Sequence, residues 1–106
     1  MLNGVIARGT TPTHTFPLNK IKAADLVDVS ITYRQKRNNV LIKRIDDVQL
    51  NDNNITVKLT QTDTIMFDPR FETVEVQVKV RTAANEVIII DTYKYRLMNS
   101  FDEEEI

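Results

Sequence analysis

His14 is the residue best suited to chemistry, because it is the single imidazole of the 106-residue chain and there is no cysteine. An imidazole can act as a general base, as a triad member with Ser30 or Ser100 and an acid, or as a metal ligand. Zinc and copper sites need further nitrogen or sulfur ligands, which this composition does not supply. We therefore expect His14, which lies between Thr13 and Thr15 in the sequence, to form a local hydrogen bond. We expect no enzymatic activity, metal or cofactor.

Three acidic residues form a second candidate set, since Asp46, Asp47 and Asp52 would suit a hard cation. Calcium loops need several converging oxygen ligands and usually a glycine at the sharp turn. This segment has no glycine, and the first two carboxylates would point to opposite faces of a continuing strand. A solvated turn is the preferred interpretation. Gly4 and Gly9 are the only glycines, so we expect no phosphate-binding loop. We also expect no small-molecule substrate.

Five basic residues fall within one predicted hairpin, namely Arg34, Lys36, Arg37, Lys43 and Arg44. The chain as a whole carries 14 basic and 15 acidic residues, a formal charge of −1, and the hairpin lacks interleaved aromatic residues. It does not predict nucleic-acid binding. A solvated hairpin is the preferred interpretation, and the alternative is contact with an acidic protein surface, such as the acidic end of a neighbouring copy.

The elements that must position these residues are strands. Thr, Val and Ile contribute 12, 11 and 11 residues, against 5 Ala and 7 Leu, and such β-branched side chains favour sheets over helices. Apolar and polar residues alternate over residues 73–81, 27–34 and 55–60, which predicts strands buried on one face. The expected inward residues are Val27, Val29, Ile31, Tyr33, Ile55, Val57, Leu59, Val74, Val76, Val78 and Val80.

Turns are expected at residues 36–39, 51–54 and 83–86, where asparagines tolerate the left-handed conformation of tight turns. Short helical turns are expected within residues 20–26 and 60–67, the second capped by Thr60 or Thr62. Pro12 and Pro17 restrict any strand between them to a sheet edge. Phe101 is expected to be the last anchor before an acidic tail at residues 102–106.

Four consecutive apolar residues begin the last predicted strand, namely Val87, Ile88, Ile89 and Ile90. Apolar residues on both faces predict a strand covered on both faces, either by a loop, by the termini or by another subunit. A free edge of this kind invites strand addition and self-association. These four residues and the five basic residues of the hairpin are therefore the candidate interaction surface.

The pattern predicts an all-β fold: a single antiparallel immunoglobulin-like sandwich of six to seven strands, with one or two short helical turns, spanning residues 1–101. A small barrel is the alternative. No apolar run reaches the roughly 20 residues of a membrane helix, and the first residues lack the features of a signal peptide. We expect synthesis and folding in the cytoplasm.

Four segments occur in an order that resembles small β-sandwich proteins of phages and prophages of Gram-positive bacteria. They are residues 8–18 (RGTTPTHTFPL), 29–35 (VSITYRQ), 59–67 (LTQTDTIMF) and 74–81 (VEVQVKVR). The similarity extends to the N-terminal domain of phage baseplate upper proteins. The chain departs from this pattern in its turn at residues 36–39, where related sequences often carry Gly-Lys, and in its acidic end.

The resemblance implies a non-enzymatic structural or assembly protein of the phage tail or baseplate. Its partners would be other virion proteins or further copies of itself, without nucleic acid or membrane insertion. It would occupy the host cytoplasm during assembly and then the virion. The alternative is a carbohydrate-binding module of a receptor-binding apparatus, although the chain has no Trp and only 7 Phe and Tyr residues.

Overall fold

The computed structural model describes residues 2–101, which form eight strands and three short helices. The predicted acidic tail lies outside these residues. The strands are β1 (Gly4–Ala7), β2 (Thr13–Pro17), β3 (Leu26–Gln35), β4 (Asn38–Arg44), β5 (Gln49–Asn51), β6 (Asn54–Lys58), β7 (Thr73–Thr82) and β8 (Val87–Met98). The helices are α1 (Gln61–Ile65) and two single 3₁₀ turns, Ala23–Asp25 and Ile45–Asp47.

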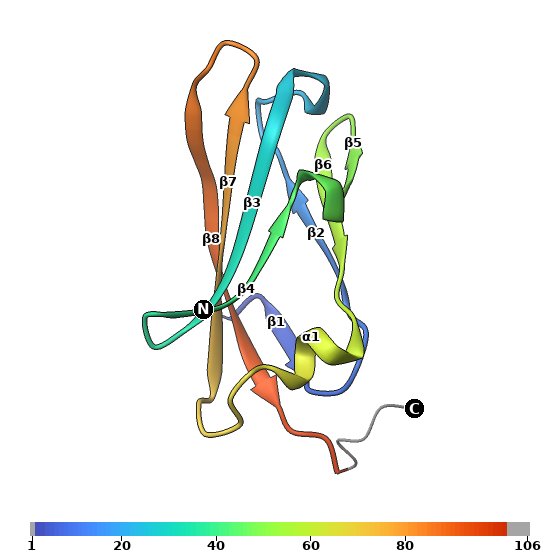
Figure 1. The fold of residues 1–106 in the computed structure, drawn as a ribbon, viewed down its shortest axis with the longest axis vertical. Helices are drawn as coiled ribbons and strands as arrows, with labels where there is room; N and C mark the ends of the chain where they lie inside the picture. Colours follow the sequence, from blue (N-terminus) through green and yellow to red (C-terminus); the bar gives the residue numbers. More distant parts are fainter. Residues whose placement is uncertain (1, 102–106) are drawn as a thin grey trace.

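The strands form two sheets, so the prediction of a mostly β fold is confirmed. One sheet has the order β1-β8-β7-β3-β4, and the other has the order β2-β6-β5. Figure 1 shows the two sheets side by side along the long axis of the molecule, with α1 near one end. The sheets stay separate, so the described residues do not form the alternative closed barrel.

β1 was not expected, and it pairs with β8 in parallel, from Gly4 opposite Tyr95 to Ala7 opposite Met98. The other strand pairs are antiparallel. The prediction of an antiparallel fold of six to seven strands is therefore wrong at the start of the chain. The four residues of β1, Gly4–Ala7, do not alternate between apolar and polar side chains, so the period-two pattern did not predict this strand.

The core lies between the sheets and contains nearly all of the expected inward residues. The four valines at the even positions of β7 from Val74 to Val80 have at most 1% of their surface exposed, which confirms the alternation. Phe16 on β2 and Ile55 and Val57 on β6 meet them from the other sheet. Burial of each such side chain contributes about 1.5–3 kcal/mol.

Val27 departs from the predicted phase of β3. The register between β3 and β7 shifts between Leu26 and Asp28, so Leu26 is buried while Val27 is 52% exposed. An extra residue in one strand of a pair reverses the facing of the residues beyond it. Val29, Ile31 and Tyr33 lie past the shift and are buried as predicted.

The turn between β3 and β4 differs from its prediction. Lys36 and Arg37 adopt the positive φ angles of 49° and 75°, whereas the asparagines expected to do so are the first two residues of β4. Two central residues with positive φ match the right-handed twist of a hairpin. In the turn between β7 and β8, Asn85 does take a positive φ of 62°.

Both expected helical turns are present, and Thr60 rather than Thr62 caps α1. The Thr60 hydroxyl accepts the N–H of Asp63 at 3.0 Å, and the Asp63 carboxylate accepts the N–H of Thr60 at 2.9 Å. Phe101, expected to be an anchor, is fully exposed. No helix among residues 2–101 has the length and apolar character needed to cross a membrane.

Candidate interaction surface

The apolar run at residues 87–90 forms the first third of β8, and only one of its faces is covered. Val87 and Ile89 are 57% and 55% exposed, whereas Ile88 and Ile90 are half-buried against the core. Among the described residues, neither a loop nor a terminus covers the outer face, and coverage by another subunit stays a prediction. Its outer face is exposed on the five-stranded sheet.

A bulge separates this run from the rest of β8. Val78 of β7 lies opposite Asp91 and Lys79 lies opposite Ile89, so Ile90 is the extra residue. The bulge changes the phase of the strand, and Ile90 and Tyr93 are both partly buried on the inner face while the two residues between them are exposed.

The edge of β8 is open along the same run, because β1 reaches only its second half. Pairing with β1 begins at Tyr95. One residue earlier, Asn3 donates its N–H to the Lys94 carbonyl at 2.6 Å, and its side-chain oxygen accepts the Lys94 N–H at 2.9 Å. Between Val87 and Thr92, no strand formed by the described residues pairs with this edge.

The backbone groups at the open edge follow from the ladder with β7. Thr82 donates its N–H to the Glu86 carbonyl at 2.9 Å, which makes this pair hydrogen-bonded. Antiparallel pairs alternate, so Ile88 bonds to Val80 while the N–H and C=O groups of Val87 and Ile89 point away from β7. Farther along, the Asp91 carboxylate accepts the N–H of Thr92 at 2.8 Å.

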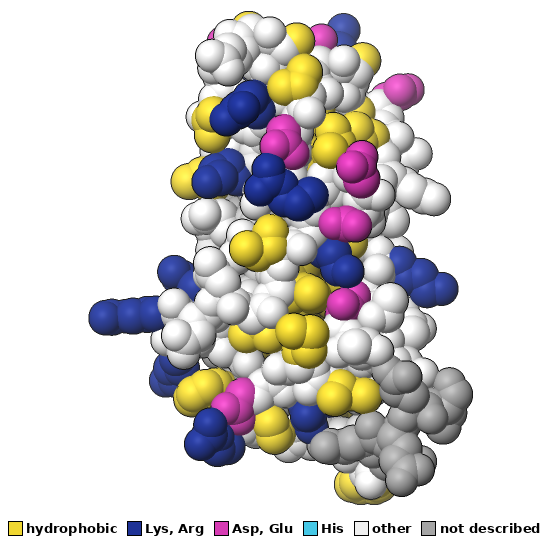
Figure 2. All heavy atoms as spheres, in the orientation of Figure 1, with side chains coloured by type: hydrophobic (Ala, Val, Ile, Leu, Met, Phe, Trp, Pro, Cys, Tyr) yellow, Lys and Arg dark blue, Asp and Glu magenta, His cyan; other side chains and the backbone are white. Residues whose placement is uncertain are grey.

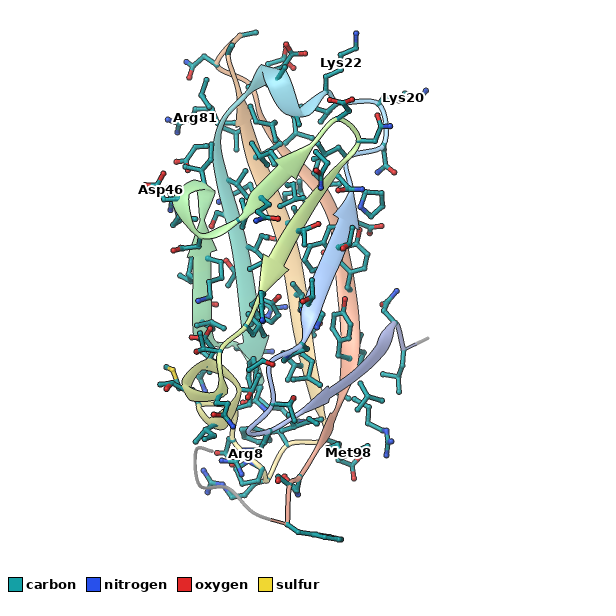
Figure 3. All side chains as sticks on the ribbon, turned by 90° about the vertical axis from the view of Figure 1, so that its right-hand side faces the viewer. Arg8, Lys20, Lys22, Asp46, Arg81 and Met98 are labelled. Carbon is teal, nitrogen blue, oxygen red and sulfur yellow. The ribbon has the colours of Figure 1, made fainter. Side chains whose placement is uncertain are left out.

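An apolar groove of about 260 Å³ adjoins this edge. It lies between the segment that follows β2, residues 18–21, and Ile88, Ile89 and Ile90. Lys20 is the charged residue of its lining. Figure 3 labels Lys20 and Lys22 at the end of the molecule that also carries Arg81, away from Arg8 and Met98.

The five basic residues of the predicted hairpin do not form one surface. Lys43 is mostly buried and pairs with Asp63 of α1 at 2.9 Å, whereas Arg44 pairs with Asp28 at 2.6 Å and Arg34 with Glu75 at 3.5 Å. Figure 2 shows basic and acidic side chains interleaved on the visible face. In the sheet, β3 and β4 lie on the far side of β7 from β8. The two halves of the predicted interaction surface approach each other at one place, where Arg44 and Val87 line the same groove.

The ion pairs of Arg44 and Lys43 lower the pKa values of their carboxyl partners, Asp28 and Asp63. The guanidinium of Arg44 and the N–H of Val29 lower the pKa of Asp28. Burial alone would raise the pKa of Asp63, but the N–H of Thr60 and the ammonium of Lys43 outweigh it and lower this pKa. Asp63 therefore links the β4 edge to the start of α1 as a charged group.

His14 is buried, and its hydrogen bond is not local as predicted. Its Nδ1 lies 2.7 Å from the hydroxyl of Tyr33 in the opposite sheet, and its ring stacks on Tyr95 with centroids 4.8 Å apart. Burial lowers the pKa of His14 from 6.5 to about 4 and raises the pKa of Tyr33. The imidazole is thus neutral at pH 7 and 7% exposed, so it acts as a polar contact between the sheets.

Sequence reasoning missed three buried polar residues that hold one end of the molecule together. Arg8 donates to the carbonyls of Phe67 and Ile65 at 2.8 and 2.9 Å, and Figure 3 places it at the end opposite Lys20. Gln35 both donates to the carbonyl of Asp68 and accepts its N–H, at 3.1 and 2.8 Å.

Thr64 is the third of these residues and has no exposed surface. Its hydroxyl accepts the N–H groups of Gly9 and Thr10 at 2.9 and 3.1 Å and donates to the Thr10 carbonyl at 2.9 Å. The capping box at Thr60 marks the start of α1 in the sequence. No local pattern indicates which side chain of α1 binds the backbone of the turn after β1.

The acidic segment behaves as a turn. Asp46 and Asp47 belong to the 3₁₀ turn after β4, and the Asp47 carboxylate accepts the N–H of Arg44 at 2.9 Å. Within residues 2–101, no group of three or more potential ligands among His, Cys, Asp and Glu could hold a metal ion. The carboxylate of Asp47 instead satisfies a backbone donor at the end of an edge strand.

Comparison with protein-family models, with curated proteins and with solved structures finds no match.

Proposed function

We propose that this chain is a non-enzymatic structural or assembly protein of a phage or prophage tail or baseplate, and that it works through protein–protein contacts. The observation that carries the proposal is the open edge of β8, where exposed Val87 and Ile89 combine apolar side chains with free backbone groups. Exposed edges of this kind bind a strand of a partner, because backbone hydrogen bonds supply affinity and side chains supply register.

We also propose that the two sheets form an immunoglobulin-like sandwich. The order β4-β3-β7-β8 corresponds to strands C′, C, F and G of that fold, and β2-β6-β5 corresponds to B, E and D. This correspondence supports the proposal without the disulfide and tryptophan of antibody domains, because the chain has neither residue. β8 then takes the place of the last strand, at one side of its sheet.

The phage setting rests on the resemblance of the four segments, and their positions support a shared fold. The first contains Arg8, the second ends at Gln35, the third contains Thr64, and the fourth falls within β7. The first three segments thus contain the buried polar residues Arg8, Gln35 and Thr64, whose hydrogen bonds hold one end of the molecule together. The resembling segments therefore contain residues that would maintain the same packing in a related domain.

Gene neighbourhood and particle composition test the proposal. We expect the gene to be flanked by tail or baseplate genes, and we expect the protein to appear by mass spectrometry in purified particles or their assembly intermediates. An Ile89→Lys variant should fold but be depleted from particles, whereas Ile42→Lys, at another exposed position on β4, should be retained. Flanking by metabolic genes alone, or equal retention of both variants, would contradict the proposal.

A carbohydrate-binding module remains the second candidate function. Such sites stack sugars on exposed aromatic rings, but Phe16, Tyr33 and Phe67 are buried. Within residues 2–101, Phe101 is the one aromatic residue among the exposed large hydrophobic residues. Specific glycan binding that is lost on Phe101→Ala would favour this alternative. A glycan array without any hit would leave the protein-contact proposal as the better explanation.

A further inference from the structure

Several strand edges of residues 2–101 carry a feature that discourages pairing. Residues 87–89 carry none and expose two large apolar side chains, whereas the open edge of β4 exposes one, Ile42. β2 ends in Pro17, which lacks an N–H, while β1 and β5 have only four and three residues. On β4 the protected part is the end of the strand, where Asp47 caps the Arg44 N–H and Lys43 is bound to Asp63. Short strands, prolines and charges are the devices by which proteins protect their edges.

The second half of β8 is protected as well. The bulge at Ile90 interrupts the strand, Asp91 caps the N–H of Thr92, and Asn3 bonds to both backbone groups of Lys94. Val87 and Ile89, in contrast, have exposed apolar side chains, and the ladder directs their N–H and C=O groups to the open edge. The unprotected segment is therefore short and sharply bounded.

From this contrast we infer that the edge at residues 87–89 pairs with the same edge of a second copy of the chain, antiparallel and about a two-fold axis at Ile88. The inference rests on the proposed role of this edge as a contact surface and names its partner. A two-fold axis at Ile88 places Val87 of each copy opposite Ile89 of the other. This register uses the outward N–H and C=O groups of both residues on both copies.

The side chains fit the same register on both faces of the joined sheet. Val87 meets Ile89 of the second copy on the outer face, where both are exposed, and the two Ile88 side chains meet on the inner face. Cross-strand pairs of aliphatic side chains stabilise antiparallel strands. On the inner side, the added strand lies beside the apolar groove that Ile88 and Ile90 help to form.

The charges near the edge are compatible with this pairing. In the same register Glu86 of the second copy lies opposite Ile90, on the side of the edge that Lys20 lines. Asp91 lies opposite Asn85 of the second copy, so no two like charges face each other. Centring the axis on Val87 or Ile89 instead leaves free backbone groups unused, because Asn85 belongs to the turn and Asp91 to the bulge.

Sedimentation over a range of protein concentrations tests the inference. The contact is short, so reversible dimerisation is expected in the range of about 10 μM to about 1 mM. Ile89→Lys and Val87→Lys should each weaken dimerisation by at least about tenfold, because they place a charge opposite an aliphatic side chain. Ile42→Lys, on the outer face of β4, is the matched control and should leave dimerisation unchanged.

Amide hydrogen exchange measured by NMR identifies the contact directly. The N–H groups of Val87 and Ile89 should gain protection as the concentration rises, while that of Ile88, already bonded to Val80, should not change. A monomer throughout this range, or dimerisation unaffected by both β8 substitutions, would overturn the inference.

The two proposals can fail separately. A monomer whose Ile89→Lys variant is still depleted from particles would refute self-pairing and leave the proposed function intact. A dimer that pairs through residues 87–89, combined with a gene that has no tail or baseplate neighbours, would support self-pairing and refute the proposed function.

Discussion

His14 shows how a residue with catalytic potential becomes a structural contact. Its ring lies between the sheets, within hydrogen-bond distance of the Tyr33 hydroxyl and stacked on Tyr95. Burial disfavours the charged imidazolium and lowers the pKa of His14 to about 4. The same burial keeps solvent and substrates away from the ring. The ring therefore stabilises the packing of β2 against the opposite sheet.

Stability should therefore depend on pH through His14. Its pKa is about 4 in the folded protein and 6.5 in the unfolded chain, so the unfolded chain binds more protons between these values. The free energy of unfolding should fall as the pH drops from 6.5 to 4, by up to about 3 kcal/mol. Urea unfolding at a series of pH values would measure this loss.

His14→Gln provides the control for this prediction. Glutamine does not titrate and still offers a hydrogen-bonding group to Tyr33, so the variant should lose the pH dependence in this window. The lowered pKa values of Asp28, Asp63 and Asp68 act mainly below pH 4, because unfolded aspartate titrates near 3.8. An unchanged pH profile in His14→Gln would show that another group is responsible.

At the scale of elements, α1 is a five-residue helix whose importance lies in its contacts. Its start is held by the capping box of Thr60 and Asp63, and Asp63 also binds Lys43 of β4. Thr64 satisfies backbone groups of the turn after β1 from inside the protein. α1 thus joins an edge strand of the larger sheet to the chain that leads into the smaller one.

Thr64→Val tests this joining role with nearly the same side-chain shape. The substitution leaves the N–H groups of Gly9 and Thr10 without their acceptor, so it should cost about 2–3 kcal/mol of stability. Thr13→Val, at an exposed position on β2, should change stability by less than about 0.5 kcal/mol. Equal costs in urea unfolding would contradict the role assigned to the Thr64 hydroxyl.

Across the whole molecule, the pairing of β1 with β8 brings the beginning and the end of the described chain together. Ile6 of β1 has no exposed surface and packs in the common core, while its neighbour Val5 is 44% exposed on the outer face. Arg8 follows directly and binds the carbonyls at the end of α1. The first strand is therefore part of the cooperative unit and not an appendage.

Ile6→Ala and Val5→Ala form a matched pair that tests this conclusion. Loss of the buried Ile6 side chain should cost about 2–5 kcal/mol, because a cavity forms in the core. Loss of the exposed Val5 side chain should cost less than about 1 kcal/mol. Thermal and urea unfolding would measure both, and a small effect at Ile6 would mean that β1 detaches without disturbing the two sheets.

The sequence predicted the elements whose signals are local. Period two located β3, β6 and β7, and a cap at Thr60 or Thr62 located α1, because these patterns depend on neighbouring residues. It also identified residues 87–90 as unusual. It failed at Val27, where one inserted residue changes the facing of the strand, and it did not locate the bulge at Ile90, because a bulge leaves no distinct composition.

What the sequence by itself determined is a β-rich chain without the residues for thiol or multi-histidine metal chemistry. Only the tertiary structure decided that His14 is enclosed, that the basic hairpin is divided among separate ion pairs, and that β1 stops short of residues 87–89. The physical reason is that an open edge depends on where a distant strand ends. Burial and pairing are set by residues far apart along the chain, so alternation alone cannot show which strand lacks a neighbour.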